Sequence, residues 1–498
     1  MKKRVFALAA VLALIAALFT LSAFAADPNA DYTEIGTADE FVTLMKSSAN
    51  WSKNYRLTAD IDLTGKGWNQ TIGDLSTAFT GIFDGNGKTI KGLSLSSISH
   101  ACVGLFGTTR DAEIRNLTVE GTVKVPSKRF IGGLIGAICG ETLVENCTSN
   151  VTVTGDSRVG GLIGGMILNT TAGTYPADSK NYTVIIRGCV SKGTVSTTKG
   201  ERVGGLIGSC SAGNSFSRHA VIENCTNEAT VSNAAAGSVG GIIGYIDPQK
   251  SEQTVTIKNC ENKGSVTGLK NSGGIAGDIR PSVAVTSEYE YAVRIVDCKN
   301  SGTVTVKQST YGQVGGIVGL FLGKGGTQLL ISGCSNTGKV DATAAKTQGR
   351  AGGIIGYTQV GSTVVSVLDV YDCTNAGLIA STSHAGGVVG YYETAGTLTV
   401  ARCINTGKIE ASGSFVAGII GAAKSKNPIQ LSSLYNSGDV TGDKYGAGII
   451  AYFSSTSNES YLIDAFNEGT IHCVGGVIGG VVGNSKLESG AIVFDKLY

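Results

Sequence analysis

The chain has 498 residues, of which 16% are charged, and its 40 lysines and arginines nearly balance its 38 aspartates and glutamates. This balance does not favour nucleic acid or an anionic membrane surface as a partner. The 72 glycines, the 6 prolines and the many Val, Ile and Thr residues are typical of short strands joined by tight turns, so we expect an all-β protein.

The first residues have the pattern of a secretory signal peptide. Three basic residues at 2–4 precede an apolar run over 5–21, and Ala23 and Ala25 occupy the two small-residue positions of a cleavage site. A membrane anchor is the alternative, but the run is short for a helix that spans a bilayer, which needs about 20 apolar residues. We therefore predict a signal peptide over 1–25, a mature chain with a formal charge near −1 and no membrane span, and an extracellular location, secreted or at the cell surface.

Residues 26–100 are predicted to form an N-terminal α/β cap. The segment 37–40, Thr-Ala-Asp-Glu, has the form of a helix capping box, and the apolar residues after it fall on one helical face. Alternating apolar residues predict one strand from Tyr55 to Leu63, and the segment 84–87, Asp-Gly-Asn-Gly, is expected to form a hairpin turn. Together these elements would cover the open end of the structure that follows.

Three aspartates of this cap, Asp60, Asp62 and Asp84, allow two interpretations. They could form a calcium site or an acid/base cluster, because carboxylates serve both purposes. Alternatively, two of them are outward-facing strand residues and the third belongs to a turn. We favour the second interpretation.

Residues 101–498 contain a recurring five-residue phrase of the type Gly-Gly-aliphatic-aliphatic-Gly. Each unit offers three short β-branched segments separated by Gly or Asn, which predicts three short strands per unit. Segments of this length bury an apolar face only when unit stacks on unit, so we expect a parallel β-solenoid of 11–12 coils. The copies of the phrase begin at residues 103, 132, 160, 204, 240, 273, 315, 352, 386, 417, 447 and 475.

A second phrase lies between successive copies, for example Asn-Cys-Glu-Asn-Lys-Gly-Ser-Val at 259–266. The residue before the cysteine is Asn, Asp or Gly in most copies, and these types tolerate a left-handed backbone, so we expect a corner there. An asparagine recurs two residues after the cysteine, and stacked coils would align these side chains in an amide ladder. The predicted ladder consists of Asn227, Asn262, Asn300, Asn336, Asn375, Asn405, Asn436 and Asn467.

The twelve cysteines would suit a disulfide framework in a secreted chain. Eight of them, however, share one repeat position that Leu117, Leu434 and Ala465 fill in other copies, so the position is an apolar interior one. Parallel Cβ directions on stacked strands disfavour disulfides, and the Cys-x2-Cys pairs of a zinc site are absent from the sequence. We expect a column of mostly reduced thiols, no metal and no cofactor. The column consists of Cys147, Cys189, Cys225, Cys260, Cys298, Cys334, Cys373 and Cys403.

The two phrases together carry a resemblance to a known family. Gly-Gly-Leu-Ile-Gly followed by Ile-x-Asn-Cys-x-Asn-x-Gly-x-Val resembles the GLUG-motif repeat of bacterial surface proteins, and the segments 55–63 and 83–90 resemble the leader that commonly precedes that repeat. Such repeats occur in adhesin-like proteins and in the non-catalytic N-terminal part of immunoglobulin-A-cleaving metallopeptidases. The resemblance therefore implies a right-handed parallel β-helix on or outside the cell. It covers nearly the whole mature chain and says little about function.

The binding face is predicted from the variation in loop length. The interval from the glycine phrase to the next cysteine position varies most, and insertions at one position of a solenoid emerge on one face, often the binding face. Aromatic and basic residues of the longest insertions could contact a sugar or a protein, with packing among the loops as the alternative. The candidate binding residues are Tyr175, Tyr182, Arg280, Tyr289 and Tyr291, with Tyr245, Tyr357, Tyr391 and Tyr452 as an extension of the same stripe.

Two classes of function remain. The first is a non-catalytic protein that adheres to or binds a host surface, an environmental surface or a glycan, and the second is a polysaccharide lyase or glycoside hydrolase. Such enzymes need paired carboxylates or a calcium site with a basic residue, whereas the outward strand positions here are largely Thr, Ser and Lys. We predict the first class, with no catalytic residues, an extracellular protein or glycan as partner, no nucleic acid, and a monomeric chain for which end-to-end association stays open.

Overall fold

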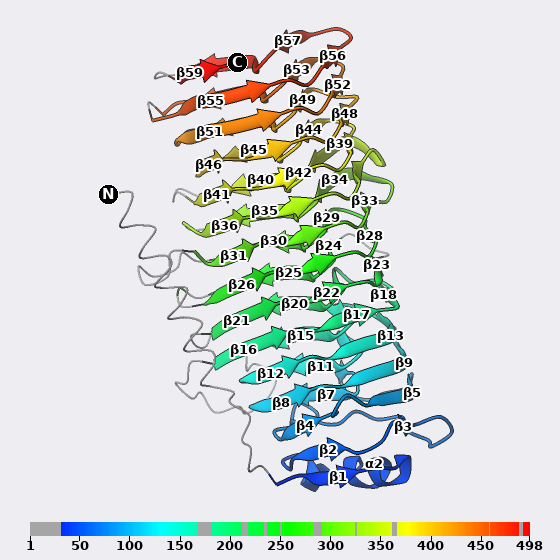
Figure 1. Cartoon of the computed structure of the whole chain (residues 1–498). Coiled ribbons are helices and arrows are strands. Elements are labelled where there is room, and N and C mark those ends of the chain that lie inside the picture. Colours follow the sequence, from blue (N-terminus) through cyan, green and yellow to red (C-terminus); the bar gives the residue numbers. More distant parts are fainter. Residues whose placement is uncertain are drawn as a thin grey trace.

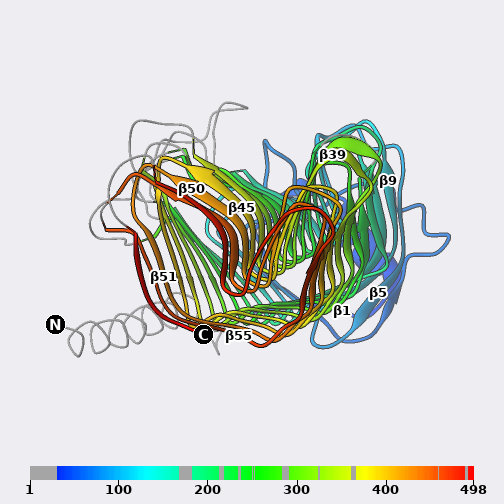
Figure 2. The same cartoon turned by 90° about the horizontal axis from the view of Figure 1, so that it is seen from above.

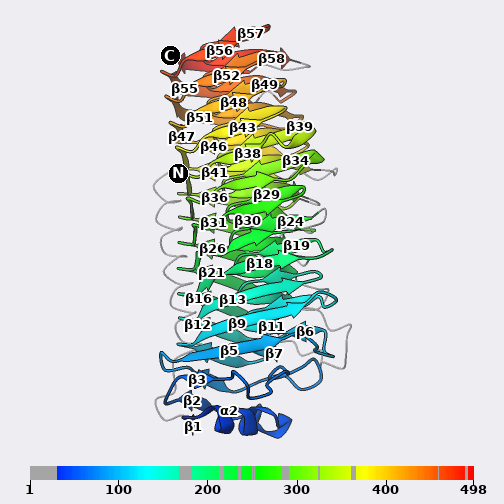
Figure 3. The same cartoon turned by 90° about the vertical axis from the view of Figure 1, so that its right-hand side faces the viewer.

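The protein is a parallel β-solenoid of about 12 turns. The computed structural model describes residues 31–498 except 168–181, 212–217, 234–236, 250, 252, 283–290, 324–325, 361–365, 458 and 488–491. Coils climb from the helix α2 (Ala38–Met45) at one end to β59 (Val493–Leu497) at the other, as Figures 1 and 3 show. The strands in front of the axis in Figure 1 point to the right as the chain climbs, which is the sense of a right-handed coil. The predicted fold class is therefore confirmed.

Three sheets run along the solenoid, and two of them have twelve strands each. We call them the leading sheet, whose strands end at the glycine phrase, and the trailing sheet, whose strands begin within it. The leading sheet consists of β6 (Cys102–Val103), β10 (Phe130–Gly132), β14 (Val159–Gly160), β19 (Arg202–Gly204), β24 (Ser238–Gly240), β29 (Asn271–Gly273), β34 (Ser309–Gly315), β39 (Ala345–Gly352), β44 (His384–Gly386), β49 (Phe415–Ala417), β53 (Tyr445–Ala447) and β57 (Val477–Gly479). The trailing sheet consists of β7 (Phe106–Thr109), β11 (Ile135–Ile138), β15 (Ile163–Ile167), β20 (Ile207–Ser211), β25 (Ile243–Asp247), β30 (Ala276–Ile279), β35 (Val318–Gly323), β40 (Ile355–Val360), β45 (Val389–Thr394), β50 (Ile420–Ser425), β54 (Ile450–Ser455) and β58 (Val482–Leu487).

The third sheet has 35 strands, and we call it the large sheet. It wraps the rest of each coil in three columns. The first column is β1 (Thr33–Ile35), β2 (Tyr55–Leu57), β4 (Ile82–Asp84), β8 (Ala112–Arg115), β12 (Thr142–Glu145), β16 (Tyr182–Arg187), β21 (Arg218–Glu223), β26 (Thr254–Lys258), β31 (Val293–Val296), β36 (Gln328–Ser332), β41 (Val367–Tyr371), β46 (Thr397–Ala401), β51 (Ile429–Asn436), β55 (Tyr461–Asn467) and β59. The short second column is β17 (Val190–Lys192), β22 (Thr226–Asn227), β27 (Glu261–Asn262), β32 (Lys299–Asn300), β37 (Ser335–Asn336), β42 (Thr374–Asn375) and β47 (Ile404–Asn405). The third column is β3 (Ile61–Asp62), β5 (Thr89–Leu95), β9 (Thr118–Val125), β13 (Thr148–Gly155), β18 (Thr194–Thr197), β23 (Thr230–Ser232), β28 (Val266–Gly268), β33 (Val304–Val306), β38 (Val340–Ala342), β43 (Ile379–Ser381), β48 (Ile409–Ala411), β52 (Val440–Gly442) and β56 (Ile471–Cys473).

Equivalent residues of the repeats stack in register, as the sequence predicts. Gly240 pairs with Gly273 in the leading sheet, and Asn262 pairs with Asn300 in the large sheet. The last copy of the glycine phrase was placed wrongly from the sequence. Gly479, not Gly475, pairs with the preceding copy at Ala447, so the last copy lies four residues later than predicted.

The predicted corner before the cysteine position is confirmed by the backbone. The residues there have positive φ, for example 55° at Asn224 and 64° at Gly333. The first and second columns of the large sheet therefore meet at a left-handed residue. This explains why Asn, Asp and Gly recur at the position.

The cysteine column lies in the core, and all twelve cysteines are free. The Cys298 Sγ donates to the carbonyl oxygen of Ile257 in the preceding coil, at 3.6 Å, and other thiols of the column do the same. Burial raises the pKa of Cys189, Cys298 and Cys334 well above the ordinary value. The predicted column of buried thiols is present.

The predicted amide ladder is also present. The Nδ2 atom of each asparagine donates to the Oδ1 atom of the next one along the axis, and every such distance from Asn227 to Asn467 is 2.7 Å. Each Nδ2 also donates within its own coil, for example from Asn336 to the carbonyl oxygen of Gly338 at 2.9 Å. The ladder therefore satisfies buried amides that would otherwise be costly.

The N-terminal region is partly as predicted. Thr37 and Glu40 form the capping box of α2, which a short 3-10 helix, η1 (Ser48–Asn50), follows. The single strand predicted over 55–63 is instead two strands, β2 and β3, which belong to different columns. The hairpin predicted at 84–87 is a solenoid corner, because β4 pairs with β2 and β8 while β5 pairs with β3 and β9. The turn residues were read correctly, but they redirect the chain into the next column.

In the part of the chain that the structure describes, no helix has the length and apolar character needed to cross a membrane.

Candidate functional site

The outward side chains of the leading and trailing sheets meet across the glycine phrase. The guanidinium carbon of Arg202 lies 3.7 Å from the ring centroid of Tyr245, and the rings of His384 and Tyr391 stack with centroids 4.5 Å apart. Outward side chains of two sheets touch in this way only where the surface between the sheets is concave. Figure 2, seen along the axis, shows the chain folding inwards between the strands β45 and β50 and the arm that carries β39. We call this surface the concave face.

Two rows of side chains line the concave face along the axis, and their order follows from the strand register. We call them the leading row and the trailing row. The leading row is Phe130, Arg158, Arg202, Ser238, Asn271, Gln313, Arg350, His384, Phe415 and Tyr445. The trailing row is Ser209, Tyr245, Asp278, Leu320, Tyr357, Tyr391, Ala422 and Tyr452.

The C-terminal part of the two rows is a continuous set of rings, which we call the aromatic platform. Tyr357 stacks on Tyr391 at 5.6 Å, and Phe415 stacks on Tyr445 at 5.0 Å. Small residues pack beneath Phe415 and Tyr445 and form an apolar cluster of their own, separate from the interior core. The rings are mostly half-buried, so part of their surface faces solvent. The platform consists of Tyr357, His384, Tyr391, Phe415, Tyr445 and Tyr452.

A polar cluster occupies the middle of the concave face. Its centre is Asp278, whose side chain is 1% exposed and which pairs with Arg280 at 2.8 Å. Ser238 Oγ and Asn271 Nδ2 donate to Asp278 at 3.0 and 2.9 Å. Although burial lowers the pKa of Arg280, the hydrogen bond and the charge of Asp278 raise it overall. The oxygen atoms of the Asp278 carboxylate are therefore occupied by protein donors.

A second carboxylate, Asp247, lies beside this cluster. It accepts hydrogen bonds from Ser282 Oγ at 3.1 Å and from Tyr245 Oη at 3.3 Å. Burial, together with the charge of Asp247, raises the pKa of Tyr245 to about 12. The phenol is thus a neutral donor at physiological pH.

The N-terminal part of the concave face is cationic. Arg158 and Arg202 are neighbours in the leading row, and the Arg158 guanidinium lies 5.0 Å from the ring centroid of Phe130. Burial, and then the charges of Arg202 and Arg129, lower the pKa of Arg158 to about 10. The face therefore changes along the axis from cationic through mixed polar to aromatic.

The structure places the residues predicted as a binding stripe in different settings. Tyr175 and Tyr289 lie outside the described residues, and Tyr182 begins β16, with only its backbone described. Arg280 joins the polar cluster of the concave face. Tyr291 is buried and donates from its hydroxyl to Asp369 Oδ2 at 2.7 Å. The four tyrosines proposed as an extension of that stripe, Tyr245, Tyr357, Tyr391 and Tyr452, all lie in the trailing row.

Sequence analysis missed the leading row altogether. Its members occupy the position two residues before the first glycine of the phrase, as Arg202 does before Gly204. The signal was present in the sequence, because arginine and aromatic residues recur at this position. It went unnoticed because nothing in the sequence shows that this position faces the trailing row.

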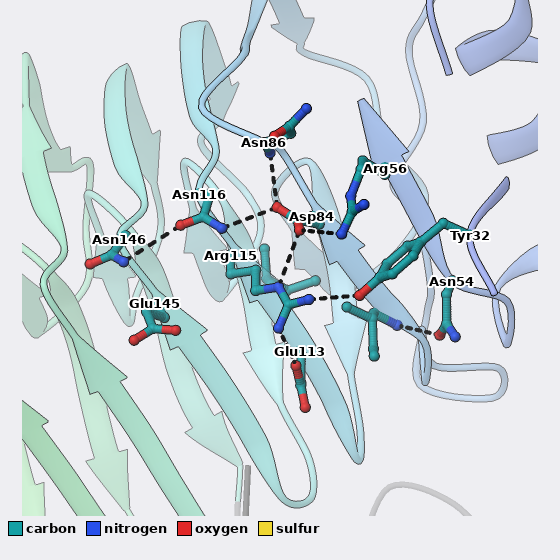
Figure 4. Close-up of polar contacts among 12 residues, drawn as sticks. Tyr32, Asn54, Arg56, Asp84, Asn86, Glu113, Arg115, Asn116, Glu145 and Asn146 are labelled. Carbon is teal, nitrogen blue, oxygen red and sulfur yellow. Dashed lines mark hydrogen bonds and ion pairs between the residues drawn. The ribbon is translucent and has the colours of Figure 1, made fainter. Parts of the chain in front are cut away.

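The aspartates of the cap do not form a site of their own. Figure 4 shows Asp84 between Arg56 and Arg115, each 3.4 Å away, with Asn116 Nδ2 donating to it at 3.1 Å. Burial raises the pKa of Asp84, but the hydrogen bonds from Asn116 and Asn86 and the two arginine charges lower it overall. Asp60 instead accepts from the backbone of Thr89. Asp62 pairs with Lys91. Among the described residues, no group of three His, Cys, Asp or Glu side chains could hold a metal ion.

Part of the chain is similar to a known protein. No family model matches the chain. An alignment 155 positions long, which covers 29% of this chain, is 36% identical to halomucin of Haloquadratum walsbyi and spans 2% of that protein's length. The crystal structure of a candidate immunoglobulin A1 protease from Bacteroides ovatus aligns over 70% of this chain and 75% of its own, with 18% identity and a TM-score of 0.32, which is too low to support an argument.

Proposed function

We propose that this chain is an extracellular, non-catalytic binding protein whose concave face holds an extended glycan. The observation that carries the proposal is the aromatic platform, in which rings from successive coils lie side by side along the axis. A sugar ring has an apolar face and a polar edge, and half-buried tyrosines offer the matching pair of a flat apolar surface and a hydroxyl. Coils repeat at about 4.8 Å, so the platform suits a ligand that is itself a linear chain.

The shape of the face supports a polymer as the ligand. The rows run along the solenoid from Phe130 to Tyr452, and both belong to rigid sheets whose strands are paired on each side. A rigid face costs little conformational entropy when a ligand binds, which favours affinity. A single chain presents the whole face, so we propose that the monomer is sufficient for binding.

Two further observations support an extracellular location. The signal-peptide pattern at 1–25 is one, and the similarity of part of the chain to halomucin is the other. The recurrent glycine and cysteine phrases also support the proposal that the repeats are of the GLUG type. The signal-peptide pattern, the similarity to halomucin and the recurrent phrases are all independent of the geometry of the concave face.

The polar cluster favours a second candidate function, polysaccharide cleavage, because it brings carboxylates to the same face. Acid/base catalysis, however, needs one carboxyl group that keeps a proton at the working pH. The carboxylate of Asp278 is instead paired with Arg280 and hydrogen-bonded to Ser238 and Asn271. We therefore rank binding above cleavage.

A polysaccharide panel tests the proposal. The purified protein is run in gels that contain each polymer, and the same mixtures are assayed for new reducing ends. We expect retardation by at least one polymer without new reducing ends. In Tyr357→Ala/Tyr391→Ala, which removes two stacked rings, we expect binding to weaken by about tenfold or more.

The matched control is Phe466→Ala. Phe466 is an exposed ring that stacks on Tyr435 on the outside of the large sheet, away from the concave face. Its loss should leave retardation unchanged. Equal weakening in both variants would remove the platform from the binding site, and new reducing ends that disappear in Asp278→Asn would favour cleavage.

A further inference from the structure

Among the described residues, two arginines of the concave face lack the carboxylate partner that Arg187 and Arg280, which are also half-buried, have. Arg158 and Arg202 sit in directly stacked coils, because Val159 pairs with Val203. Within the described residues, neither guanidinium forms an ion pair with a carboxylate or a hydrogen bond to a protein acceptor. Glu201 attracts Arg158 only from beyond ion-pair distance.

Two other arginines of the chain have the carboxylate partners that Arg158 and Arg202 lack. Arg115 pairs with Asp84 and Glu113, and Arg187 pairs with Glu145 at 2.5 Å. A partly buried charge without a partner costs free energy, and two like charges on adjacent strands add repulsion. The free protein therefore holds two positive charges that an anion would stabilise.

Each of the two guanidinium groups also lies over an aromatic ring. Arg202 lies over the ring of Tyr245 at 3.7 Å and Arg158 over the ring of Phe130 at 5.0 Å. Stacking on a ring occupies the flat face of a guanidinium and leaves its N–H edges free. Those edges form the planar fork that binds carboxylate or sulfate oxygens in pairs.

A third arginine extends the pattern along the axis. Arg350 lies over Tyr357 at 3.9 Å, and among the described residues it too forms no ion pair with a carboxylate. It belongs to β39, four coils beyond the strand β19 that carries Arg202. At about 4.8 Å per coil the two are roughly 19 Å apart along the axis.

We infer that the concave face binds an acidic polysaccharide, one whose sugars carry carboxylate or sulfate groups, and that Arg158 and Arg202 form its anion site. This inference rests on the proposed function, because it names the ligand class of the same face. The carboxylates Asp247 and Asp278 lie between the cationic positions and would repel a dense, uniform polyanion such as nucleic acid. A polymer with widely spaced acidic groups fits a face on which arginines and carboxylates alternate along the axis. Its sugar rings would stack on the aromatic platform.

Pairs of polymers that differ only in charge test the inference. Dextran is compared with dextran sulfate, and methyl-esterified with de-esterified polygalacturonate, by affinity electrophoresis and calorimetry with the full mature chain. We expect the acidic member of at least one pair to bind about tenfold or more tightly than its neutral partner. This preference should shrink as salt is raised from about 0.05 M to about 0.5 M, because screening weakens partly exposed charge pairs.

Substitutions then locate the anion site. In Arg158→Gln/Arg202→Gln we expect the affinity for the acidic polymer to fall by about tenfold or more, and by a larger factor than the affinity for any neutral polymer. Arg158→Lys/Arg202→Lys keeps the charge but loses the planar fork. Its affinity for the acidic polymer should lie between those of the natural protein and the glutamine variant. The control is Arg402→Gln, which removes one positive charge at an arginine that pairs with Asp372 on the large sheet, and it should bind like the natural protein. Unfolding curves of all variants report whether the fold is retained.

The results distinguish the acidic ligand class from glycan binding in general. Neutral and acidic polymers bound equally well would overturn the acidic ligand while leaving glycan binding in place. The assigned site would be overturned if Arg158→Gln/Arg202→Gln kept the preference for the acidic polymer. It would also be overturned if Arg402→Gln lowered that preference equally. Failure to bind any polymer would reject both this inference and the proposed function.

Discussion

His384 shows how a single residue is adapted to the aromatic platform. Its ring stacks on Tyr391 with an interplanar angle of 17° and lies 5.4 Å from Phe415. Burial, and then the charge of Arg350, lower the pKa of His384 to about 4. At neutral pH the imidazole is therefore uncharged and packs as another ring of the platform.

The lowered pKa predicts a specific loss of stability in acid. An unfolded histidine titrates near about 6.5, so between about pH 6.5 and pH 4 the unfolded chain binds more protons at this position than the folded one. The stabilisation is present above that window and is lost as the pH falls through it. In His384→Phe, which keeps a ring and removes the titration, the drop in Tm from pH 7 to pH 4.5 should be smaller than in the natural protein. An equal drop in both would show that His384 does not contribute.

At the scale of the element, the turn between a leading and a trailing strand explains the concave face. A Cβ atom at Gly316 would lie 2.1 Å from the carbonyl oxygen of Gly353 in the next coil and 2.5 Å from the Cγ atom of Asn336. The second glycine of the phrase thus packs directly on the amide ladder of the large sheet. The coil is only one side chain thick there, so the phrase is drawn inwards and the two rows turn towards each other.

The same contact predicts a strong effect of one methyl group. Gly316→Ala should lower the free energy of unfolding by about 2–4 kcal/mol, because backbone of the next coil has to shift to make room. Gly480 is the matched control. It holds the same position in the last coil, where a Cβ atom would have no neighbour within 4 Å. Urea unfolding of Gly480→Ala should match the natural protein, and a comparable loss in both variants would contradict this account of the phrase.

On the scale of the whole molecule, the two ends of the described solenoid differ. At the N-terminal end Phe41 of α2 packs against Trp68 and Phe83, with ring centroids 5.1 and 6.5 Å apart. At the other end Val477 and Phe494 are exposed, with 48% and 42% of their surface accessible. Coils of a solenoid interact mainly with their neighbours, so each end affects the coils next to it.

This one-dimensional coupling predicts local fraying from the N-terminal end. Phe41→Ala should remove about 3–5 kcal/mol of local stability, since Phe41 is fully buried. Hydrogen exchange should then speed up in β2, β4 and β8 and stay unchanged from β36 onwards. Phe494→Ala serves as the control at the exposed end and should alter exchange little. Faster exchange along the entire chain would mean that the solenoid unfolds as one cooperative unit.

The sequence by itself determined the strands, the corners, the thiol column and the amide ladder. This was possible because, in a solenoid, equal positions in successive repeats become neighbours in space, so the spacing of Cys298 and Asn300 from their counterparts sets the register. The three errors in the fold have the same origin. The strand at 55–63, the turn at 84–87 and the phrase at 475 fit the local pattern, but only strand pairing shows which column or register they take.

The tertiary structure alone decided where the candidate site lies. The sequence predicted a stripe on the variable loops and included four tyrosines of the trailing row, but it gave no sign that Arg202 or His384 faces them. That relation depends on how closely the glycine phrase approaches the ladder across the coil, a distance that strand periodicity does not encode. The contact of Gly316 with Asn336 bends the surface inwards, and this bend joins two separate rows of residues into one face.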